Sequence, residues 1–318
     1  MLRYVVGRVA QALLVLWAAY TVTFVVLYLL PSDPVALLLS ANNVQLDSLS
    51  PAQIAAVRAQ YGFDQPVGLQ YLHLLLRALH GDFGTSIASH LPVADLIASR
   101  LPQTLLLSGL ALVLAVVLGA TTAFLAAYVQ WPPARLFLLR VPSLGVSLPT
   151  FWIGLLLIQV FAFNLRWVPA TGSTGWRSYV LPAVTMAIPT SASLAQVLTR
   201  SLRDTLSESY VTTARAKGLS RLQVQLRHAS RNAALPALTI LGLLVGATVT
   251  GAITVETVFS RAGIGRLAAE SVLAQDVPVV QGIVVVAAAA FVAVNLVVDL
   301  LYPLIDPRVV HAPRVTTL

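Results

Sequence analysis

The chain has 318 residues, of which 58% are hydrophobic and only 10% are charged, and its mean hydropathy is +0.83. This composition excludes an ordinary soluble domain, which could not bury so much apolar surface, and indicates an integral membrane protein. Lysine and arginine outnumber aspartate and glutamate by 20 to 12, and the lack of cysteine excludes disulfides, thiolate catalysis and cysteine-ligated metals.

Six charge-free runs are long enough to cross a bilayer core, which takes about 20 apolar residues. In chain order they cover residues 9–30, 101–128, 141–165, 178–199, 232–255 and 277–298. Backbone polar groups in lipid must be satisfied within their own segment, and these runs are too uniformly apolar for barrel strands. We therefore expect an all-α polytopic membrane bundle with six transmembrane helices.

The first run is too long for the apolar part of a secretory signal, and no small-x-small cleavage site follows it. We therefore expect a retained transmembrane helix over residues 1–30 and an extracytoplasmic segment over 31–99. In that segment Ser50, Pro51 and Gln53 predict a helix that stops at Gly62.

A leucine stripe at positions 69, 72, 76 and 79 predicts a second short helix in the same segment. It is too short to span a membrane, so it lies at the interface or packs on the bundle. The segment could receive a substrate-delivering receptor or serve as a structural cap. His73 and His80 could share a helix face, but without a third ligand nearby we expect no metal site there.

The basic residues predict the orientation of the chain. With a cytoplasmic N-terminus, thirteen lysines and arginines fall on the inner side and seven on the outer side. This distribution follows the positive-inside bias, so both termini are expected in the cytoplasm.

Two patterns within the runs concern the bundle interior. The fifth run has small residues four apart, at Gly242 and Gly246 and at Ala247 and Gly251, which would let another helix approach closely, within this chain or from a partner. Amides at membrane depth, Gln159, Gln196 and Asn295, are costly if unpaired, so they line a translocation path or join helices. The runs contain no charge pair, which argues against a proton-coupled transporter.

Residues 201–231, between the fourth and fifth runs, form a stretch that we call the polar island. Seven basic residues lie between positions 200 and 231, and burying them in lipid would cost roughly 20 kcal/mol at about 3 kcal/mol each. Gly218 can form a left-handed cap after a first helix. Ser220 and Gln223 can start a second helix, with Leu222, Leu226 and Ala229 on one face.

This helix–glycine–helix pattern has more than one interpretation. A solvated loop that only sets topology fits the charge, and so does a structured docking site. A nucleic-acid-binding helix pair is disfavoured because both ends are tethered to the membrane.

A short acidic and basic turn follows the fifth run. Glu256 precedes Phe259, Arg261 and Arg266, and Gly263 and Gly265 lie between the two arginines. A surface ion pair worth less than about 1 kcal/mol is one interpretation. The other is that Glu256 and Phe259 help to gate the outer mouth or meet a receptor, with the glycines allowing the turn to move.

The polar island carries a family resemblance. Thr212, Thr213, Ala214, Arg215, Ala216, Lys217, Gly218 and Leu219, followed by His228, Asn232 and Pro236, resemble the EAA loop of ABC importer permeases of the dipeptide/oligopeptide/nickel branch. The leading glutamate of the general motif is Thr212 here. The resemblance implies that these eight residues couple the permease to a cytoplasmic ATPase.

Four further stretches resemble the same family in the same order: 100–105, 147–152, 255–259 and 304–308. One departure is Ala262, where the family pattern has a proline before Gly263, and this puts the rigidity of that turn in doubt. The resemblance implies a type I importer permease fold, with residues 100–310 as a five-helix core that contains the coupling loop.

The resemblance also implies partners and a location. They are a second homologous permease, one or two ABC ATPase subunits, an extracytoplasmic substrate-binding protein and the inner membrane of a prokaryote. The only lysine, Lys217, does not close a P-loop, so ATP and Mg²⁺ would bind to the ATPases, and we expect no cofactor, metal, catalytic site or nucleic acid for this chain. The alternatives are an autonomous channel, a secondary transporter, or a membrane scaffold without transport.

Overall fold

The structure is a computed structural model that describes residues 2–28, 50–53 and 66–305. Its secondary structure is helical, and within these residues the only β pairing is an isolated bridge between Thr85 and Pro92. The elements, in chain order, are α1 (Leu2–Tyr28), α4 (Val67–Leu79), α5 (Val93–Tyr128), α6 (Pro132–Ser147), α7 (Thr150–Leu157), η2 (Ile158–Asn164), α8 (Arg177–Leu206), α9 (Ser209–Ala216), α10 (Arg221–Gln223), η3 (Val224–Ala229), α11 (Ser230–Val258), α12 (Ile264–Leu273) and α13 (Val277–Ile305).

Five of the six expected spans are single stretches of helix. They are Val6–Val26, Val93–Tyr128, Arg177–Leu206, Arg221–Val258 and Val277–Leu296. The second of them begins at Val93, before the start of the charge-free run, and the last two residues of the first predicted run lie outside the described residues.

The third expected span, residues 141–165, is not one straight helix. Helices α6 and α7 with η2 meet at an angle of 104°, and α6 begins at Pro132. The break follows from Pro149, because a proline disfavours helical backbone in the residue before it, and Leu148 is extended with φ −89° and ψ 133°. The prediction of one continuous span was therefore wrong in shape.

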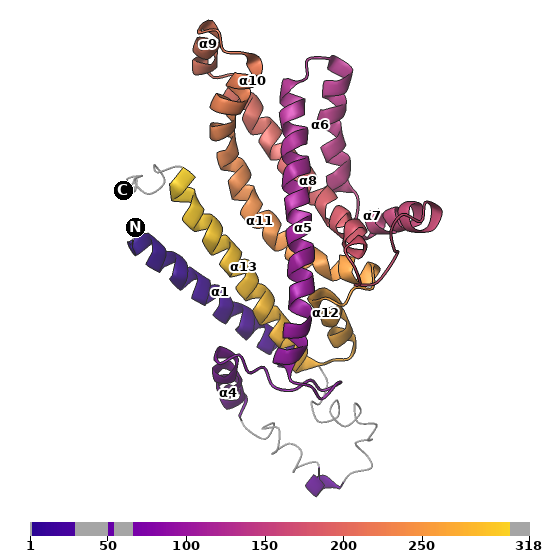
Figure 1. Ribbon diagram of the computed structural model, residues 1–318. Helices are drawn as coiled ribbons and strands as arrows, with labels where there is room; N and C mark the ends of the chain where they lie inside the picture. The colour runs from indigo at the N-terminus through magenta and orange to yellow at the C-terminus, as the bar shows by residue number, and fades with distance from the viewer. Residues whose placement is uncertain (1, 29–49, 54–65, 306–318) are drawn as a thin grey trace.

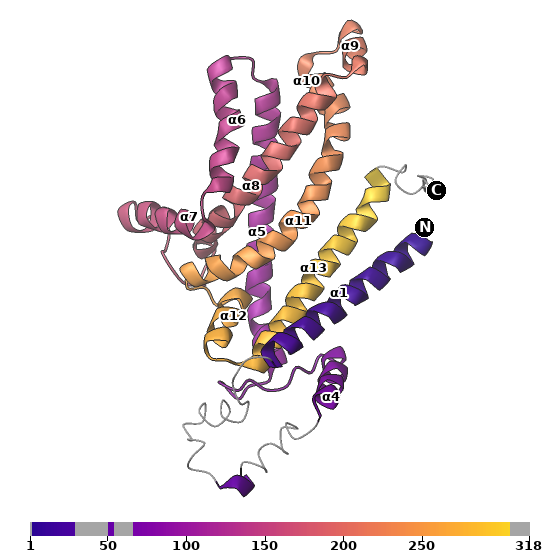
Figure 2. The same ribbon diagram turned by 180° about the vertical axis from the view of Figure 1, so that it is seen from behind.

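The polar island and the segment before α5 lie at opposite ends of the bundle. Figures 1 and 2 show α9 and α10 at one end, beside the α5–α6 turn, and α4 and α12 toward the other. The N-terminal end of α1 and the C-terminal end of α13 both point toward the α9 end. We call the two ends the α9 end and the α4 end.

Helix α8 lies at the centre of the bundle and packs on α5, α6, α7 and α11, whereas α1 packs mainly on α13. Glycines permit two of these close approaches: a Cβ at Gly119 would lie 2.8 Å from the Ser191 carbonyl oxygen, and one at Gly145 would lie 2.9 Å from Ala192 Cβ. Of the two α11 glycines Gly246 and Gly251, only the first permits close packing of another helix. A Cβ at Gly246 would overlap the Phe291 ring of α13, whereas nothing lies within 4 Å at Gly251.

Helix α4 confirms the second short helix that the leucine stripe predicts. It contacts α1 through Tyr71, which shares a 2.7 Å hydrogen bond with Thr21 and packs edge-on against Phe24. Leu69, Leu72, Leu76 and Leu79 are all exposed in the isolated chain. The capping box of the first short helix is also present, since the Gln53 N–H donates to Ser50 Oγ and the Ser50 N–H to Gln53 Oε1, but its predicted course to Tyr61 lies outside the described residues.

Candidate functional site

The polar island folds as two helices separated by a glycine, as the sequence predicts. Gly218 has φ +85°, and its N–H donates to the Arg215 carbonyl at 2.9 Å, so it ends α9 in the left-handed conformation that favours glycine. Ser220 and Gln223 form the predicted capping box, with reciprocal bonds of 3.3 and 3.0 Å. The island is therefore a defined projection at the α9 end (Figure 1).

Most of the predicted coupling residues face outward. Six of the eight are exposed: Thr212, Thr213, Arg215, Ala216, Lys217 and Gly218. Ala214 is buried in a small cluster with Val211 and Val224, and Leu219 packs against its edge. The island therefore has its own apolar core and presents a polar surface away from the bundle.

The second island helix continues α10 as a π-helical segment that contacts the end of α5. Residues 224–229 form a π-helical segment in which Val224, Gln225 and Ala229 are buried, while Leu222 and Leu226 are about half exposed. The sequence predicts one face for Leu222, Leu226 and Ala229, and of these three only Ala229 is buried in the isolated chain. Gln225 Nε2 donates to the Phe124 carbonyl at 2.8 Å, and Arg221 Nη2 donates to the Ala127 carbonyl at 3.0 Å. These bonds occupy carbonyl groups at the C-terminal end of α5.

At the opposite end, the turn 259–263 joins α11 to α12, and we call it the α11–α12 turn. Glu256, in the last turn of α11, is completely buried. It accepts hydrogen bonds from Thr104 Oγ1 at 2.6 Å and from the N–H groups of Gly265 at 2.7 Å and Arg266 at 3.3 Å. The carboxyl group thus caps the N-terminal turn of α12, where unpaired N–H groups favour an acidic partner.

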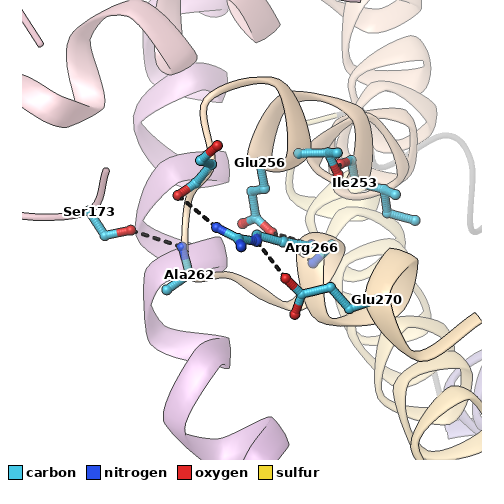
Figure 3. Close-up of polar contacts among 9 residues, drawn as sticks. Ser173, Ile253, Glu256, Ala262, Arg266 and Glu270 are labelled. Carbon is cyan, nitrogen blue, oxygen red and sulfur yellow. Dashed lines mark hydrogen bonds and ion pairs between the residues drawn. The ribbon is translucent and has the colours of Figure 1, made fainter. Parts of the chain in front are cut away.

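The predicted surface ion pair of Glu256 is absent from this part of the structure. Arg266 pairs instead with Glu270 at 2.7 Å, four residues later on α12 (Figure 3). The role predicted for the two glycines also changes. A Cβ at Gly263 would overlap the Glu256 carboxyl group, and one at Gly265 would overlap the Ile253 backbone. These glycines permit close contact between α11 and α12, and their φ angles are not in the left-handed region.

Arg261, in the same turn, is almost completely buried, at 1% exposure. Its Nη1 donates to the carbonyl oxygens of Gly172 and Ser178 at 3.2 and 2.8 Å, and its guanidinium carbon lies 4.0 Å from the Tyr179 ring centroid. Burial lowers the pKa of the guanidinium from its ordinary value. Its Nη2 is buried and has no hydrogen-bond partner in the described part of the chain.

The backbone N–H of Ala262 has a hydrogen-bond partner that a proline at this position would lose. This N–H donates to Ser173 Oγ at 2.9 Å (Figure 3), which a proline could not do because it has no N–H. The Gly172 N–H also donates to the Phe259 carbonyl at 3.1 Å. The loop 165–176 is therefore hydrogen-bonded to the α11–α12 turn at two points, Phe259 and Ala262.

Asp276, for which the sequence predicted no role, is hydrogen-bonded to residues 86–88. Its carboxyl oxygens accept hydrogen bonds from Ser86 Oγ at 2.5 Å, the Ile87 N–H at 3.1 Å and the Ala88 N–H at 3.2 Å. Ser86 ends the sequence Gly-Asp-Phe-Gly-Thr-Ser over residues 81–86, which follows α4 and was the available signal for one partner. The separation of 190 residues left the other partner undetected.

The structure does not bring the predicted pathway residues together. Gln159 is exposed and donates to Asn164 Oδ1 at 3.4 Å, and Asn295 donates to the Phe291 carbonyl of its own helix at 2.8 Å. Phe259 is buried in the apolar cluster around Leu107 and Met186. Gln196 lines a hollow, described next.

Two hollows lie beside α8. The larger, of about 600 Å³, lies between α6 and α8 and is lined by Leu138, Leu139, Pro142, Gln196, Thr199, Arg200, Arg203, Asp204 and Ser207. The smaller, of about 190 Å³, lies among α7, α8 and α11 and is lined by Thr150, Met186, Pro189, Thr190, Ser193, Leu244, Ala247, Thr248 and Gly251. Gln196 is the one predicted pathway residue that lines either hollow.

Comparison with known proteins matches residues 1–311 of the chain to two family models. Residues 96–311 match the family described as "Binding-protein-dependent transport system inner membrane component", and residues 1–108 match its N-terminal companion family. The glutathione transport system permease protein GsiC of Escherichia coli K12 is 39% identical over 312 residues, which cover 97% of this chain and 99% of the relative. GsiC of Shigella flexneri serotype 5b has the same identity and coverage.

Two solved structures share the fold. An inward-facing MetNI methionine ABC transporter matches 66% of this chain and 96% of its own, with a TM-score of 0.54 and 13% identity. An amino acid ABC transporter with histidines matches 67% of this chain and 94% of its own, with a TM-score of 0.50 and 22% identity. At these identities the likeness concerns the fold alone.

Proposed function

The chain belongs to the family of binding-protein-dependent transport system inner membrane components and is a permease subunit of an ABC importer, and we propose that it forms half of a translocation pathway for di- or oligopeptides or related small solutes. The glutathione transport named for its relatives supports a peptide-like solute. The other half of the pathway would come from a second, homologous permease.

The polar island is the observation that carries the coupling part of this proposal. Its exposed residues, with the glycine break at Gly218, project beyond the helices at the α9 end and are stiffened by their own small core. Such a projection can insert into a cleft of a cytoplasmic ATPase and pass its movement to α8 and α11. ATP and Mg²⁺ would bind to that ATPase, and this chain would hold no cofactor and perform no hydrolysis.

The opposite end suits an extracytoplasmic partner. Helices α4 and α12 lie there (Figures 1 and 2), and α12 is held to the bundle by the buried contacts of Glu256. A substrate-binding protein that docks on this end would meet a firmly attached surface. This arrangement requires cytoplasmic termini and an extracytoplasmic segment 31–99, in a multi-pass protein of the inner membrane.

Co-purification tests the coupling assignment. Gly218→Pro removes the left-handed cap, and Ala216→Trp adds bulk at an exposed site without disturbing the buried Ala214. Both variants should insert in the membrane but fail to retain the ATPase subunits. Gly175→Pro is the matched control, because Gly175 also has positive φ, +74°, and lies in a loop at the opposite end of α8.

Two outcomes would contradict the proposal. If the island variants retain the ATPases and stimulate them normally, the coupling site lies elsewhere. If the wild-type chain purifies without any second permease or ATPase and still transports, it is an autonomous channel or secondary transporter.

Single cysteines test the orientation, since the chain has none of its own. Arg215→Cys in α9 should react with a membrane-impermeant thiol reagent only after lysis, whereas Leu273→Cys in α12 should react in intact cells. Both positions are exposed in the structure. The reverse pattern would invert the proposed topology.

A further inference from the structure

Helix α8 differs from the other transmembrane helices in composition and burial. Its most apolar window has the lowest hydropathy of the five single-helix spans, yet 56% of that window is buried, against 28% or less in the others. Its buried residues are mostly in the core of the bundle, whereas polar side chains of its second half, among them Gln196, Arg200 and Arg203, are exposed. A polar, central helix of this kind is suited to contact a solute in transit.

Both hollows open on one broad face of α8. Ser193 lines the smaller hollow, and Gln196, Arg200 and Arg203 line the larger. Their spacings of three, four and three residues place them on the same side of the helix. Along this side, the residues change from hydroxyl groups at mid-membrane to guanidinium groups near the α9 end.

The larger hollow has two chemically different walls. Helix α6 contributes Leu138, Leu139 and Pro142, and α8 contributes the polar and charged residues. The side chains of Arg200 and Arg203 have no hydrogen bond or ion pair within the described residues. Asp204 is the only acidic residue in the lining. The hollow therefore has net positive charge, free guanidinium donors and an apolar surface opposite them.

We propose that this hollow is a binding site in the translocation pathway for the carboxylate of an anionic small solute, held by Arg200 and Arg203. The proposal rests on the proposed function and adds the charge class of the cargo. A guanidinium group binds a carboxylate through parallel, charge-assisted hydrogen bonds, and the leucine wall accepts an apolar side chain of the same solute. A peptide with a free C-terminus, ionised at neutral pH, has both features.

The test compares two cargoes that differ only at the carboxylate. The complete wild-type transporter with its binding protein is reconstituted in vesicles, and uptake of radiolabelled trialanine and of trialanine amide is measured well below saturation, so that rates report kcat/KM. In the double variant Arg200→Gln/Arg203→Gln, uptake of trialanine should fall at least about threefold more than uptake of the amide. The double variant Arg200→Lys/Arg203→Lys keeps the charge and should retain much of the preference.

Arg135→Gln/Arg140→Gln provides the matched control. These two arginines are exposed on α6 and do not line the hollow, so the control removes the same charge from the same end of the bundle. Its uptake ratio for the two peptides should equal that of the wild type. Loss of the preference in the control would overturn the proposal in favour of a general surface-charge effect.

Two further results would also overturn it. An equal loss of both peptides in the glutamine variant would mean that the arginines support structure or topology. A preference that is present in vesicles with anionic lipid and absent in purely zwitterionic vesicles would assign the hollow to a lipid headgroup. If the wild type imports neither peptide while its ATPases respond to the binding protein, the peptide cargo of the proposed function is wrong, and this proposal fails with it.

Discussion

The close contact between α11 and α12 predicts a large effect from adding one methyl group at Gly265. A Cβ there would overlap the backbone of Ile253, which cannot rotate away as a side chain could. Helix α12 would have to shift, and its first turn would then lose the bonds from the Gly265 and Arg266 N–H groups to the Glu256 carboxyl group. The perturbation therefore combines overpacking with loss of hydrogen bonds to a buried acidic group.

The size of the effect follows from these two parts. Overpacking typically costs about 1–3 kcal/mol, and loss of hydrogen bonds to an acidic group adds about 1.5–3 kcal/mol. We therefore expect Gly265→Ala to destabilise the protein by about 2.5–6 kcal/mol. Gly263→Ala should also be destabilising, because its new methyl group would overlap the buried Glu256 carboxyl group and displace it from its bonds to Thr104 and α12.

Gly251→Ala is the matched control in α11, since nothing lies within 4 Å of a Cβ at that position. Alanine favours helix over glycine by about 1 kcal/mol, so this variant should be neutral or slightly stabilised. Apparent Tm of the full-length protein, followed by fluorescence-detected gel filtration after heating, would rank the three variants. Equal Tm values for Gly265→Ala and Gly251→Ala would refute the close packing of α11 and α12.

Three other predictions concern buried and surface polar groups. Glu256→Gln should lower the free energy of unfolding by about 1.5–3 kcal/mol and alter ATPase stimulation by the binding protein. Glu270→Gln, which removes a surface pair, should cost less than about 1 kcal/mol. Tm values of the two variants would compare these losses. Arg261→Met should loosen residues 165–176, because it leaves buried carbonyl groups unpaired, and limited proteolysis should cut this loop about tenfold faster; unchanged cutting would contradict the role of Arg261. The hydrogen bond from the Arg77 side chain lowers the pKa of Asp82, so this exposed pair is fully formed above the ordinary aspartate pKa and is lost as pH falls through the lower folded-state pKa. Asp82→Asn should therefore remove the small decrease in Tm that acid causes. An identical dependence of Tm on pH in the variant would argue against the pair.

Signals that act within one turn of helix were reliable in this chain. The positive φ of Gly218 and the Ser220–Gln223 capping box follow from residues adjacent in sequence, so the sequence alone was enough to place them. The bend at Pro149 was also readable, because the residue before a proline resists helical backbone. The apolar run 141–165 contains Pro149 and is long enough for one span, so the prediction followed the length of the run and missed the bend.

Contacts between distant residues were not predictable from one sequence. The environment of Glu256 depends on Thr104, which is 152 residues away, and on the missing side chains at Gly263 and Gly265. In sequence, Glu256 and its arginine neighbours therefore resembled a surface pair. The bond from Gln225, in the π-helical segment 224–229, to the Phe124 carbonyl of α5 likewise joins residues 101 apart in sequence.

The hydrogen bond between Ala262 and Ser173 has an evolutionary consequence. A relative with proline at the position of Ala262 has no N–H to offer, so selection to keep a hydroxyl at the position of Ser173 is removed. Substitutions at the two positions should therefore be correlated across descendants of a common ancestor, although 89 residues separate them. In a lineage with proline at this position Ser173 would be free to vary, while the bonds from Arg261 to the Gly172 and Ser178 carbonyl groups could still hold the loop.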